Sequence, residues 1–367
     1  MISKDAIDSL LASYDLKDIT IATICSHSAL QIFHGARTEG FKTLGICVRD
    51  RKKVYEAFSL ANPDELLVVE NFNEILAPEL QNRLIERNTI IIPHGSFVEY
   101  VGSEALTNSF HVPVFGNRKT LEWESSRTKQ REWLQEAGLR LPEEYKRPSE
   151  IDGKVFVKLP GAKGGKGFFT ANSEEEYHTK LEERVEKGVL SEENASKTAI
   201  QEFIVGVRYY PHYFYSLFES PGLRVDTGSI ELLSMDKRIE PIDESYRGLP
   251  NIPAEFYDYT VTGNQAVVVR ESLLSEVLDM GTKAVVASIA LFPPGMIGAF
   301  SLETIYQPEK GFTVFEVSAR IVAGTNLYPQ GSPYSFYLYK EPMSTGRRIA
   351  REIRNAIDRN DLAKIVF

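Results

Sequence analysis

The segment from Val157 to Gly167 has the composition of an anion-binding loop. Four glycines and two lysines, Lys163 and Lys166, stand within residues 161–167, and Lys158 precedes them in an apolar run. Glycine lets backbone N–H groups approach an anion closely, and the lysines add positive charge. The loop matches neither the GxxxxGK[ST] nor the GxGxxG pattern. The alternative is a solvated turn, which is less favoured because Lys158 in an apolar strand needs a polar partner.

A second group of chemically useful residues lies near the C-terminus. Glu316, Ser318 and Arg320 alternate along a predicted strand and therefore share one face, which Glu303 on the preceding strand can meet across a hairpin. Two close carboxylates repel each other unless a cation lies between them. Such oxygen ligands suit Mg²⁺, which also shares nucleotide phosphate oxygens, and Arg320 could stabilise a transferring phosphoryl group. The alternative is an exposed hairpin face with an incidental ion pair.

The first third of the chain is predicted to position ligands at the ends of parallel strands. Short apolar runs alternate there with helix-period segments, which indicates βαβ units with both sheet faces covered. The first strand is followed by Ser26 as the expected helix cap. Ligands in such sheets bind beyond the carboxyl ends of the strands, here the loops 25–28 and 94–96. The expected strands are 18–25, 42–48, 66–69, 89–93 and a fifth at 112–115, with helices at 26–36 and 73–86.

The remaining chain changes to paired strands and longer helices. A helix is predicted from Arg118 to Ala137, ending at Gly138. Neighbouring strands separated by short glycine-containing segments favour antiparallel hairpins. The expected pairs are 155–159 with 167–171, 200–204 with 207–216, and 297–306 with 313–317, and further helices are expected at 271–289 and 343–359.

Composition restricts the class of protein further. The 367 residues carry 42 Lys and Arg against 51 Asp and Glu, a formal net charge of −9, which argues against a nucleic-acid partner. Cys25 and Cys47 lie in apolar runs and are expected to be buried and reduced, without a structural zinc site. The polar, helix-like N-terminus does not resemble a secretory signal, and the apolar stretches are too short to span a membrane. We therefore expect a soluble cytoplasmic protein.

Together, the early glycine loop and the late carboxylate pair resemble the ATP-grasp superfamily. The segment Gln201–Gly206 looks like its adenine-binding hinge strand, and residues 118–142 look like its entry segment. The first third resembles the Rossmann-like domain that precedes ATP-grasp. The resemblance implies an α/β and α+β fold: residues 1–117 form a parallel-sheet domain, and residues 118–367 form an ATP-grasp domain whose glycine-loop subdomain covers about 140–216.

Short motifs that run in order through nearly the whole chain narrow the resemblance. They are similar to those of the archaeal formate-dependent FAICAR synthetase family of purine biosynthesis. The motifs are SHSAL at 26–30, PHGSF at 93–97, VFGNR at 114–118, WES at 123–125, MDKR at 235–238, TGN at 262–264, PGMIG at 294–298 and GRRIAREI at 346–353. This family uses ATP to convert formate to formyl phosphate, which the amino group of 5-aminoimidazole-4-carboxamide ribonucleotide (AICAR) attacks to give FAICAR, ADP and phosphate.

The resemblance also implies a role for each matching residue. Arg320 and Lys158 would be catalytic, Glu303 and Glu316 would bind Mg²⁺ or Mn²⁺, and His27, Ser96 and Asn264 would bind AICAR. The expected ATP contacts are Lys158, Gly161, Lys163, Gly164, Gly165, Lys166, Gly167, Glu202, Phe203, Ile204 and Glu240. No Ser/His/Asp arrangement is needed or evident. The implied partners are AICAR and formate, with neither nucleic acid nor membrane, in a homo-oligomer.

Three departures from the family pattern keep other functions open. Arg208 stands where many ATP-grasp proteins have an acidic ribose ligand, and Glu303 stands where some members have Gln. The run 321–326 is less polar than the corresponding family segment. The alternatives are a paralogue that joins a different amine and carboxylate, and a nucleotide-binding regulator without turnover. The set of Lys158, the two carboxylates and Arg320 favours an enzyme.

Overall fold

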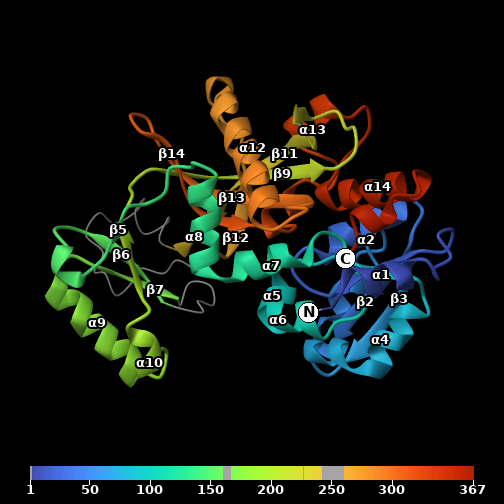
Figure 1. Cartoon of the computed structure of the whole chain (residues 1–367), viewed down its shortest axis with the longest axis horizontal. Coiled ribbons are helices and arrows are strands. Elements are labelled where there is room, and N and C mark those ends of the chain that lie inside the picture. The colour runs from blue at the N-terminus through green and yellow to red at the C-terminus, as the bar shows by residue number, and fades with distance from the viewer. Residues whose placement is uncertain (1, 160–166, 226, 242–259) are drawn as a thin grey trace.

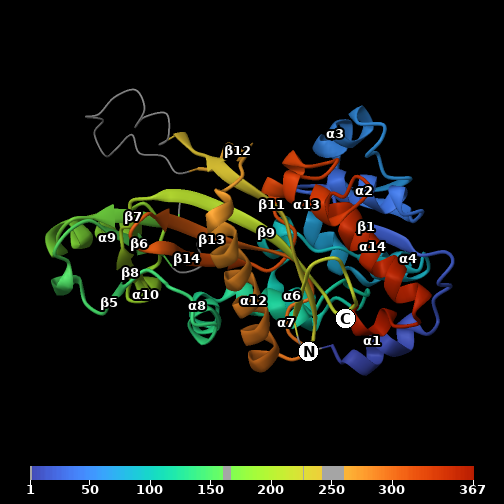
Figure 2. The same ribbon diagram turned by 90° about the horizontal axis from the view of Figure 1, so that it is seen from above.

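The computed structural model describes residues 2–159, 167–225, 227–241 and 260–367. Three sheets organise these residues, as Figure 1 shows. A parallel sheet with helices and a small antiparallel sheet lie at opposite ends of the molecule, and a large antiparallel sheet lies between them (Figures 1 and 2). The predicted class, a Rossmann-like parallel sheet followed by antiparallel sheets, is confirmed.

The N-terminal sheet has the order β3-β2-β1-β4, and each neighbouring pair is parallel. All five residues of β1 are buried because helices cover both faces. The predicted fifth strand at 112–115 is wrong, because this segment makes only isolated bridges from Val114 and Phe115. The elements are α1 (Lys4–Leu11), β1 (Thr20–Ile24), α2 (Ala29–Thr38), β2 (Lys42–Val48), η1 (Arg49–Arg51), α3 (Lys52–Ala57), β3 (Glu65–Val69), η2 (Phe72–Leu76), α4 (Pro78–Ile85), β4 (Thr89–Ile91), α5 (Gly95–Tyr100) and α6 (Ser103–Asn108).

The small sheet has the order β5-β8-β6-β7 and is antiparallel. The predicted pairing of 155–159 with 167–171 is confirmed, since Val155 lies opposite Ala171. The predicted hairpin of 200–204 with 207–216 is wrong, because β8 pairs with β6 while β9 (Val207–Ser216) enters the large sheet. The elements are β5 (Glu144–Tyr145), η3 (Pro148–Glu150), β6 (Val155–Lys158), β7 (Phe168–Ala171), α9 (Glu174–Glu186), α10 (Glu192–Ala195) and β8 (Ala199–Glu202).

The large sheet has the order β10-β11-β9-β13-β14, and β12 pairs with the far end of β11. One face is apolar and packs against α8 (Arg127–Glu136) and α12, where Tyr213, Met235 and Phe300 are buried in a common core. The opposite face carries the alternate residues, which are mostly polar. The elements are β9 (Val207–Ser216), β10 (Leu223–Val225), β11 (Gly228–Ile239), β12 (Gly263–Ala266), η6 (Glu271–Leu273), α12 (Leu274–Leu291), β13 (Gly298–Gln307) and β14 (Gly311–Ser318).

Two helices replace the predicted helix over 118–137. α7 (Arg118–Ser125) ends at Ser126, whose side chain accepts a hydrogen bond from Lys129 N and so caps α8 (Arg127–Glu136). The cap of α2 also differs from the expected Ser26: its N-cap residue is Ser28. No described helix is long and apolar enough to cross a bilayer.

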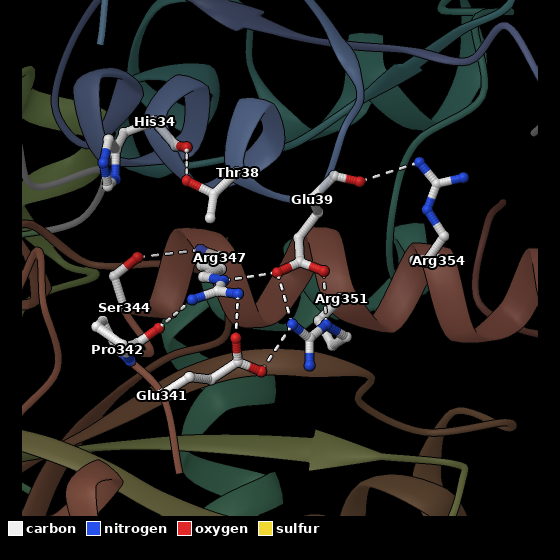
Figure 3. A network of polar contacts seen from close by, with 9 residues as sticks. All are labelled: His34, Thr38, Glu39, Glu341, Pro342, Ser344, Arg347, Arg351 and Arg354. Atoms are coloured by element: carbon white, nitrogen blue, oxygen red, sulfur yellow. Dashed lines mark hydrogen bonds and ion pairs between the residues drawn. The ribbon is translucent and has the colours of Figure 1, made fainter. Parts of the chain in front are cut away.

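The C-terminal helix packs against the N-terminal part of the molecule. η7 (Ala323–Leu327), α13 (Pro333–Leu338), α14 (Thr345–Asp358) and η8 (Leu362–Lys364) complete the chain. Gly35 on α2 lies so close to α14 that a Cβ there would be 2.2 Å from Arg347 N. Figure 3 shows the adjoining ion pairs, in which Arg347 and Arg351 bind the Glu39 carboxylate. These contacts join segments about 300 positions apart and hold α14 against α2.

Candidate active site

A pocket of about 290 Å³ opens between the small sheet and the polar face of the large sheet. Strand β6 supplies Lys158, and the segment after β8 supplies Phe203 and Ile204. Of the predicted glycine loop only Gly167 belongs to the described residues, and it lines this pocket; Gly161, Lys163, Gly164, Gly165 and Lys166 lie outside them. The remaining lining residues are Arg127, Pro142, Phe156, Phe168, Gln201, Glu202, Arg208, Tyr210, Arg238, Glu240, Val261, Glu303, Ile305, Phe315 and Glu316.

Lys158 finds its polar partners on the large sheet. Its Nζ donates to Phe315 O at 3.3 Å and lies 5.7 Å from the centre of the Phe315 ring. Burial lowers the pKa of Lys158, and the negative charge of Glu316 partly opposes this effect. The neighbouring Arg127 donates through Nε to Leu159 O at 3.1 Å. The site therefore holds a half-buried cation that an anionic ligand can approach.

The two carboxylates predicted to face each other do so. Glu303 and Glu316 are direct partners in the β13–β14 register. Arg238 binds both oxygens of Glu303, at 2.8 and 2.5 Å, and Ser318 Oγ donates to Glu303 at 3.3 Å. Burial and the charge of Glu303 raise the pKa of Glu316. A divalent cation would relieve this repulsion and therefore suits the pair.

The described residues contain no group of three or more His, Cys, Asp or Glu that could enclose a metal ion. A cation at Glu303 and Glu316 would therefore complete its coordination with water or with oxygens of a bound ligand. This is how Mg²⁺ is commonly held beside phosphates. The donor set fits an ion that arrives together with a nucleotide.

A hinge-like segment forms another wall of the pocket. Glu202 accepts from Glu143 N at 3.5 Å, and Lys310 lies 3.8 Å from its carboxylate. Arg208, which occupies the position expected for an acidic residue, forms an ion pair with Glu240. The acidic side chain at this wall of the pocket is therefore Glu240, which follows β11, and not a residue of β9.

The predicted strand-end loops bring a second group of residues together. His27 has a φ of 51° and stacks on His94, with 5.3 Å between the ring centres. A Cβ on Gly95 would lie 3.0 Å from His27 Nε2 and 3.3 Å from Arg320 Cζ, so glycine permits this close approach. Ser96 Oγ donates to Ser26 Oγ at 2.9 Å. His27, Ser96 and Arg320 therefore meet at the carboxyl ends of the parallel strands.

His94 and Glu124 support this group, and neither was predicted to do so. His94 Nε2 lies 3.0 Å from Ile24 O and its Nδ1 accepts from Ser96 N, while burial lowers its pKa to about 3. Glu124 lies 3.0 Å from Arg320 Nη2, and burial raises the pKa of this carboxyl. Both residues stand in quoted motifs, PHGSF and WES, but their roles depend on contacts that no local pattern reveals.

The pocket and the strand-end group are electrostatically continuous. Desolvation, then the neighbouring His94, Arg320 and Arg238, lower the pKa of His27 well below its ordinary value. Arg238 is also the partner of Glu303 in the pocket. Arg238 therefore acts on both the pocket and the strand-end group, and such proximity of two sites is what an enzyme that joins two bound ligands requires.

Asn264 lies beside a row of buried, hydrogen-bonded polar side chains that was not predicted from the sequence. Its Nδ2 donates to Asp236 at 2.7 Å, and Asp236 in turn contacts His212. His212 Nδ1 lies 2.7 Å from Ser234 Oγ, so a Ser–His–Asp arrangement exists after all. All three residues are at most 2% exposed, which excludes them as a nucleophilic site open to substrate.

Comparison with known proteins agrees with this geometry. A family profile described as "Domain of unknown function (DUF1297)" matches residues 176–367, and one described as "Protein of unknown function (DUF1246)" matches residues 21–145. The chain is 52% identical over its full length to a 5-formaminoimidazole-4-carboxamide-1-(beta)-D-ribofuranosyl 5'-monophosphate synthetase of Korarchaeum cryptofilum, of which it covers 100%. The chain belongs to the FAICAR synthetase family. The predicted resemblance is thus confirmed.

Solved structures extend the comparison to the fold. The crystal structure of an IMP biosynthesis protein, PurP, from Thermococcus kodakaraensis has a TM-score of 0.73 and 32% identity, covering 95% of this chain and 100% of that one. An ADP complex of N5-carboxyaminoimidazole ribonucleotide synthetase has a TM-score of 0.59 at 12% identity, covering 92% and 77%. The chain therefore shares the fold of both structures, in agreement with the predicted ATP-grasp fold.

Proposed function

We propose that the chain formylates AICAR to FAICAR at the expense of ATP and formate, releasing ADP and phosphate, as a step of inosine monophosphate synthesis. Formate is a poor electrophile because oxide would have to leave. Transfer of the γ-phosphoryl group to a formate oxygen gives formyl phosphate. The 5-amino nitrogen of AICAR then bonds to the formyl carbon while the C–O bond to phosphate breaks, and the amine proton leaves with the phosphate.

The pocket between the sheets is the proposed nucleotide site. Lys158, with Gly161, Lys163, Gly164, Gly165, Lys166 and Gly167, would hold the phosphates. Glu202 with the backbone of Phe203 and Ile204 would hold adenine, and Glu240 would make a further contact. The support is that Lys158 and the described members of this set line one pocket of about 290 Å³. The chain's ADP-bound fold neighbour agrees with this choice of ligand.

Glu303 and Glu316 are the proposed ligands of Mg²⁺ or Mn²⁺. The bound cation would shield phosphate charge during phosphoryl transfer. Arg320, beside the His27 ring, would stabilise the transferring group, and Lys158 would act from the opposite side. The raised pKa of Glu316 supports this assignment, because burial and the charge of Glu303 disfavour the ionised carboxylate and a bound cation would offset both effects.

AICAR is proposed to bind at the strand-end group through His27, Ser96 and Asn264. The amine of AICAR is a weak nucleophile because its lone pair is delocalised into the ring. Orientation and exclusion of water therefore matter more than a strong base. His27 is exposed at this site, and its lowered pKa favours the neutral ring, which can both donate and accept a hydrogen bond.

The observation that carries the proposal is that Lys158 lines one pocket with the carboxylates of Glu303 and Glu316, while Arg320 lies beside His27 in the neighbouring strand-end group. The test measures ADP release with formate present, with and without AICAR, and identifies the product by mass. We expect ADP release that depends on both substrates and yields FAICAR. AICAR-independent release without a formylated product would remove the proposal, and a product from another amine would identify a paralogue of different specificity.

Three further expectations belong to this proposal. We propose a boundary at 117/118 between the two domains, which limited proteolysis with mass analysis can test. A homo-oligomer is proposed and is tested by sedimentation. A cytoplasmic location is proposed because all substrates are charged metabolites, and fractionation tests it.

A further inference from the structure

A buried polar chain ends at the proposed AICAR ligand Asn264. On neighbouring strands β9 and β11, His212 Nδ1 lies 2.7 Å from Ser234 Oγ and His212 Nε2 lies 2.7 Å from Asp236 Oδ1. Asn264 Nδ2 on β12 lies 2.7 Å from Asp236 Oδ2. His212 and Asp236 are each 1% exposed, whereas Asn264 is half-buried at the edge of the sheet. These hydrogen bonds thus connect the buried interior of the large sheet to a half-buried residue at its edge.

The Asp236 carboxylate determines which group donates and which accepts in each of these hydrogen bonds. An ionised carboxylate only accepts, so His212 donates through Nε2–H and Asn264 donates through Nδ2–H. His212 Nδ1 then accepts from the Ser234 hydroxyl. This assigns the Asn264 amide orientation, because its oxygen must point away from Asp236. No described residue donates to Asn264 Oδ1, which remains available as an acceptor.

Gly324 in η7 provides independent evidence that the Asp236 carboxylate is held in place. A Cβ on Gly324 would lie 2.3 Å from Asp236 Oδ1 and 2.8 Å from Oδ2. Only glycine lets the backbone of this segment pack against the carboxylate. The same segment reaches the strand-end group, since Asn326 Nδ2 donates to His27 O at 3.0 Å. Backbone packing and hydrogen bonds therefore fix Asp236 from two sides.

We propose that Asp236 and His212 are positioning residues that hold Asn264 Oδ1 toward the ribonucleotide, where it accepts an N–H of the carboxamide and selects carboxamide over carboxylate. This inference rests on the proposed function. The reacting amine has to face the formyl group near Arg320, which leaves the carboxamide as the N–H donor that can be recognised. An acceptor oxygen backed by a carboxylate favours a donor and repels an anion.

The test measures binding of AICAR, of its analogue with carboxylate in place of carboxamide, and of ADP, by calorimetry on the full chain. The wild type should prefer the carboxamide. In Asp236→Leu the Asn264 amide can rotate, so AICAR binding should weaken about tenfold and the preference should fall by a similar factor. ADP binding should change less than twofold. Measured kinetically, KM for AICAR should rise more than kcat falls.

A conservative variant and a matched control separate positioning from stability. Asp236→Asn should retain most of the preference, because its oxygen can still accept from Asn264 while its amide donates to the other tautomer of His212. Glu39→Gln removes a buried carboxylate from the distant network of Figure 3 and should leave all three affinities unchanged. If Asp236→Leu does not fold, the same binding measurements are made on Gly324→Ala, because this substitution displaces the Asp236 carboxylate without removing a polar group.

The result that would overturn the inference is specific. An unchanged carboxamide preference in Asp236→Leu or Gly324→Ala, or equal losses of AICAR and ADP binding, would assign Asp236 a structural role only. A wild type that binds neither ribonucleotide would instead refute the proposed function.

Discussion

Replacing Arg238 by Met tests the environment of the carboxylate pair. The guanidinium binds both oxygens of Glu303, at 2.8 and 2.5 Å, and lies 4.1 Å from the centre of the Tyr210 ring. The Glu303 side chain is only 5% exposed, so its charge has little access to water without this partner. Glu316 lies directly opposite on the next strand. The substitution therefore leaves two facing carboxylates without their main countercharge.

We expect Arg238→Met to lower the free energy of unfolding by about 3 kcal/mol. Removing one partner of a buried ion pair commonly costs about 3–5 kcal/mol. The lower end applies because Arg238 itself is 24% exposed and because Glu316, whose pKa is raised, can take up a proton. Urea unfolding in the presence of a chelator measures this loss.

Adding Mn²⁺ with ADP should then stabilise Arg238→Met more than the wild type. In the variant the cation no longer shares Glu303 with a guanidinium, and saturation at 100 times the dissociation constant contributes about 2.7 kcal/mol. Arg351→Met is the matched control, because Arg351 also binds a carboxylate, Glu39, through two nitrogens. Mn²⁺ with ADP should stabilise Arg351→Met no more than it stabilises the wild type. Equal stabilisation of Arg238→Met and wild type would refute the assignment of Glu303 to a cation.

Three other predictions follow from the same site. Glu316→Gln should abolish formate-dependent ADP release while thermal stability is kept or raised, because the repulsion with Glu303 disappears; full activity would contradict the metal assignment. His27→Ala should raise KM for AICAR about tenfold and leave KM for ATP within twofold, whereas equal rises would indicate a structural role. Burial lowers the pKa of His94 to about 3 from 6.5, so between pH 7 and pH 5 only the unfolded state takes up this proton, and folding should lose about 2 kcal/mol. His94→Asn should lack that loss in urea titrations at the two pH values. A pH dependence identical to that of the wild type would contradict the lowered pKa of His94.

The sequence predicted the carboxylate face because its signal is local. Glu316, Ser318 and Arg320 follow the two-residue period of a strand, and the next strand is only a short turn away. The strand-end loops were predictable for a similar reason, since the order of strands and helices alone places their carboxyl ends on one edge. The predicted position of His27 and Ser96 on these loops consequently agrees with the structure.

The errors arise where tertiary contacts override local signals. Gly206 suggested a hairpin turn, but a Cβ there would lie 2.5 Å from Tyr306 O, so this glycine permits close packing as the chain passes between sheets. Strand β11 escaped prediction because a bulge between Leu232 and Ser234 interrupts its alternation. The contact of His212 with Asp236 joins positions 24 apart on paired strands, and only the strand register reveals it.

The net charge of −9 argued against a nucleic-acid partner but did not restrict small anions. The proposed ligands are all anionic, and their countercharge is local. Lys158 on the small sheet, Arg238 on the large sheet and Arg320 just after β14 supply it, next to carboxylates that suit a cation. Local arrangement thus matters more than total charge for such ligands.

The central claim is that formate is activated as formyl phosphate before the amine attacks. Turnover with ¹⁸O-labelled formate and unlabelled ATP tests it most directly, with the released phosphate analysed by mass spectrometry. The proposed chemistry predicts one ¹⁸O atom in the phosphate for each FAICAR formed, because the oxygen that bonds to phosphorus leaves with it. Unlabelled phosphate accompanying FAICAR would contradict this mechanism.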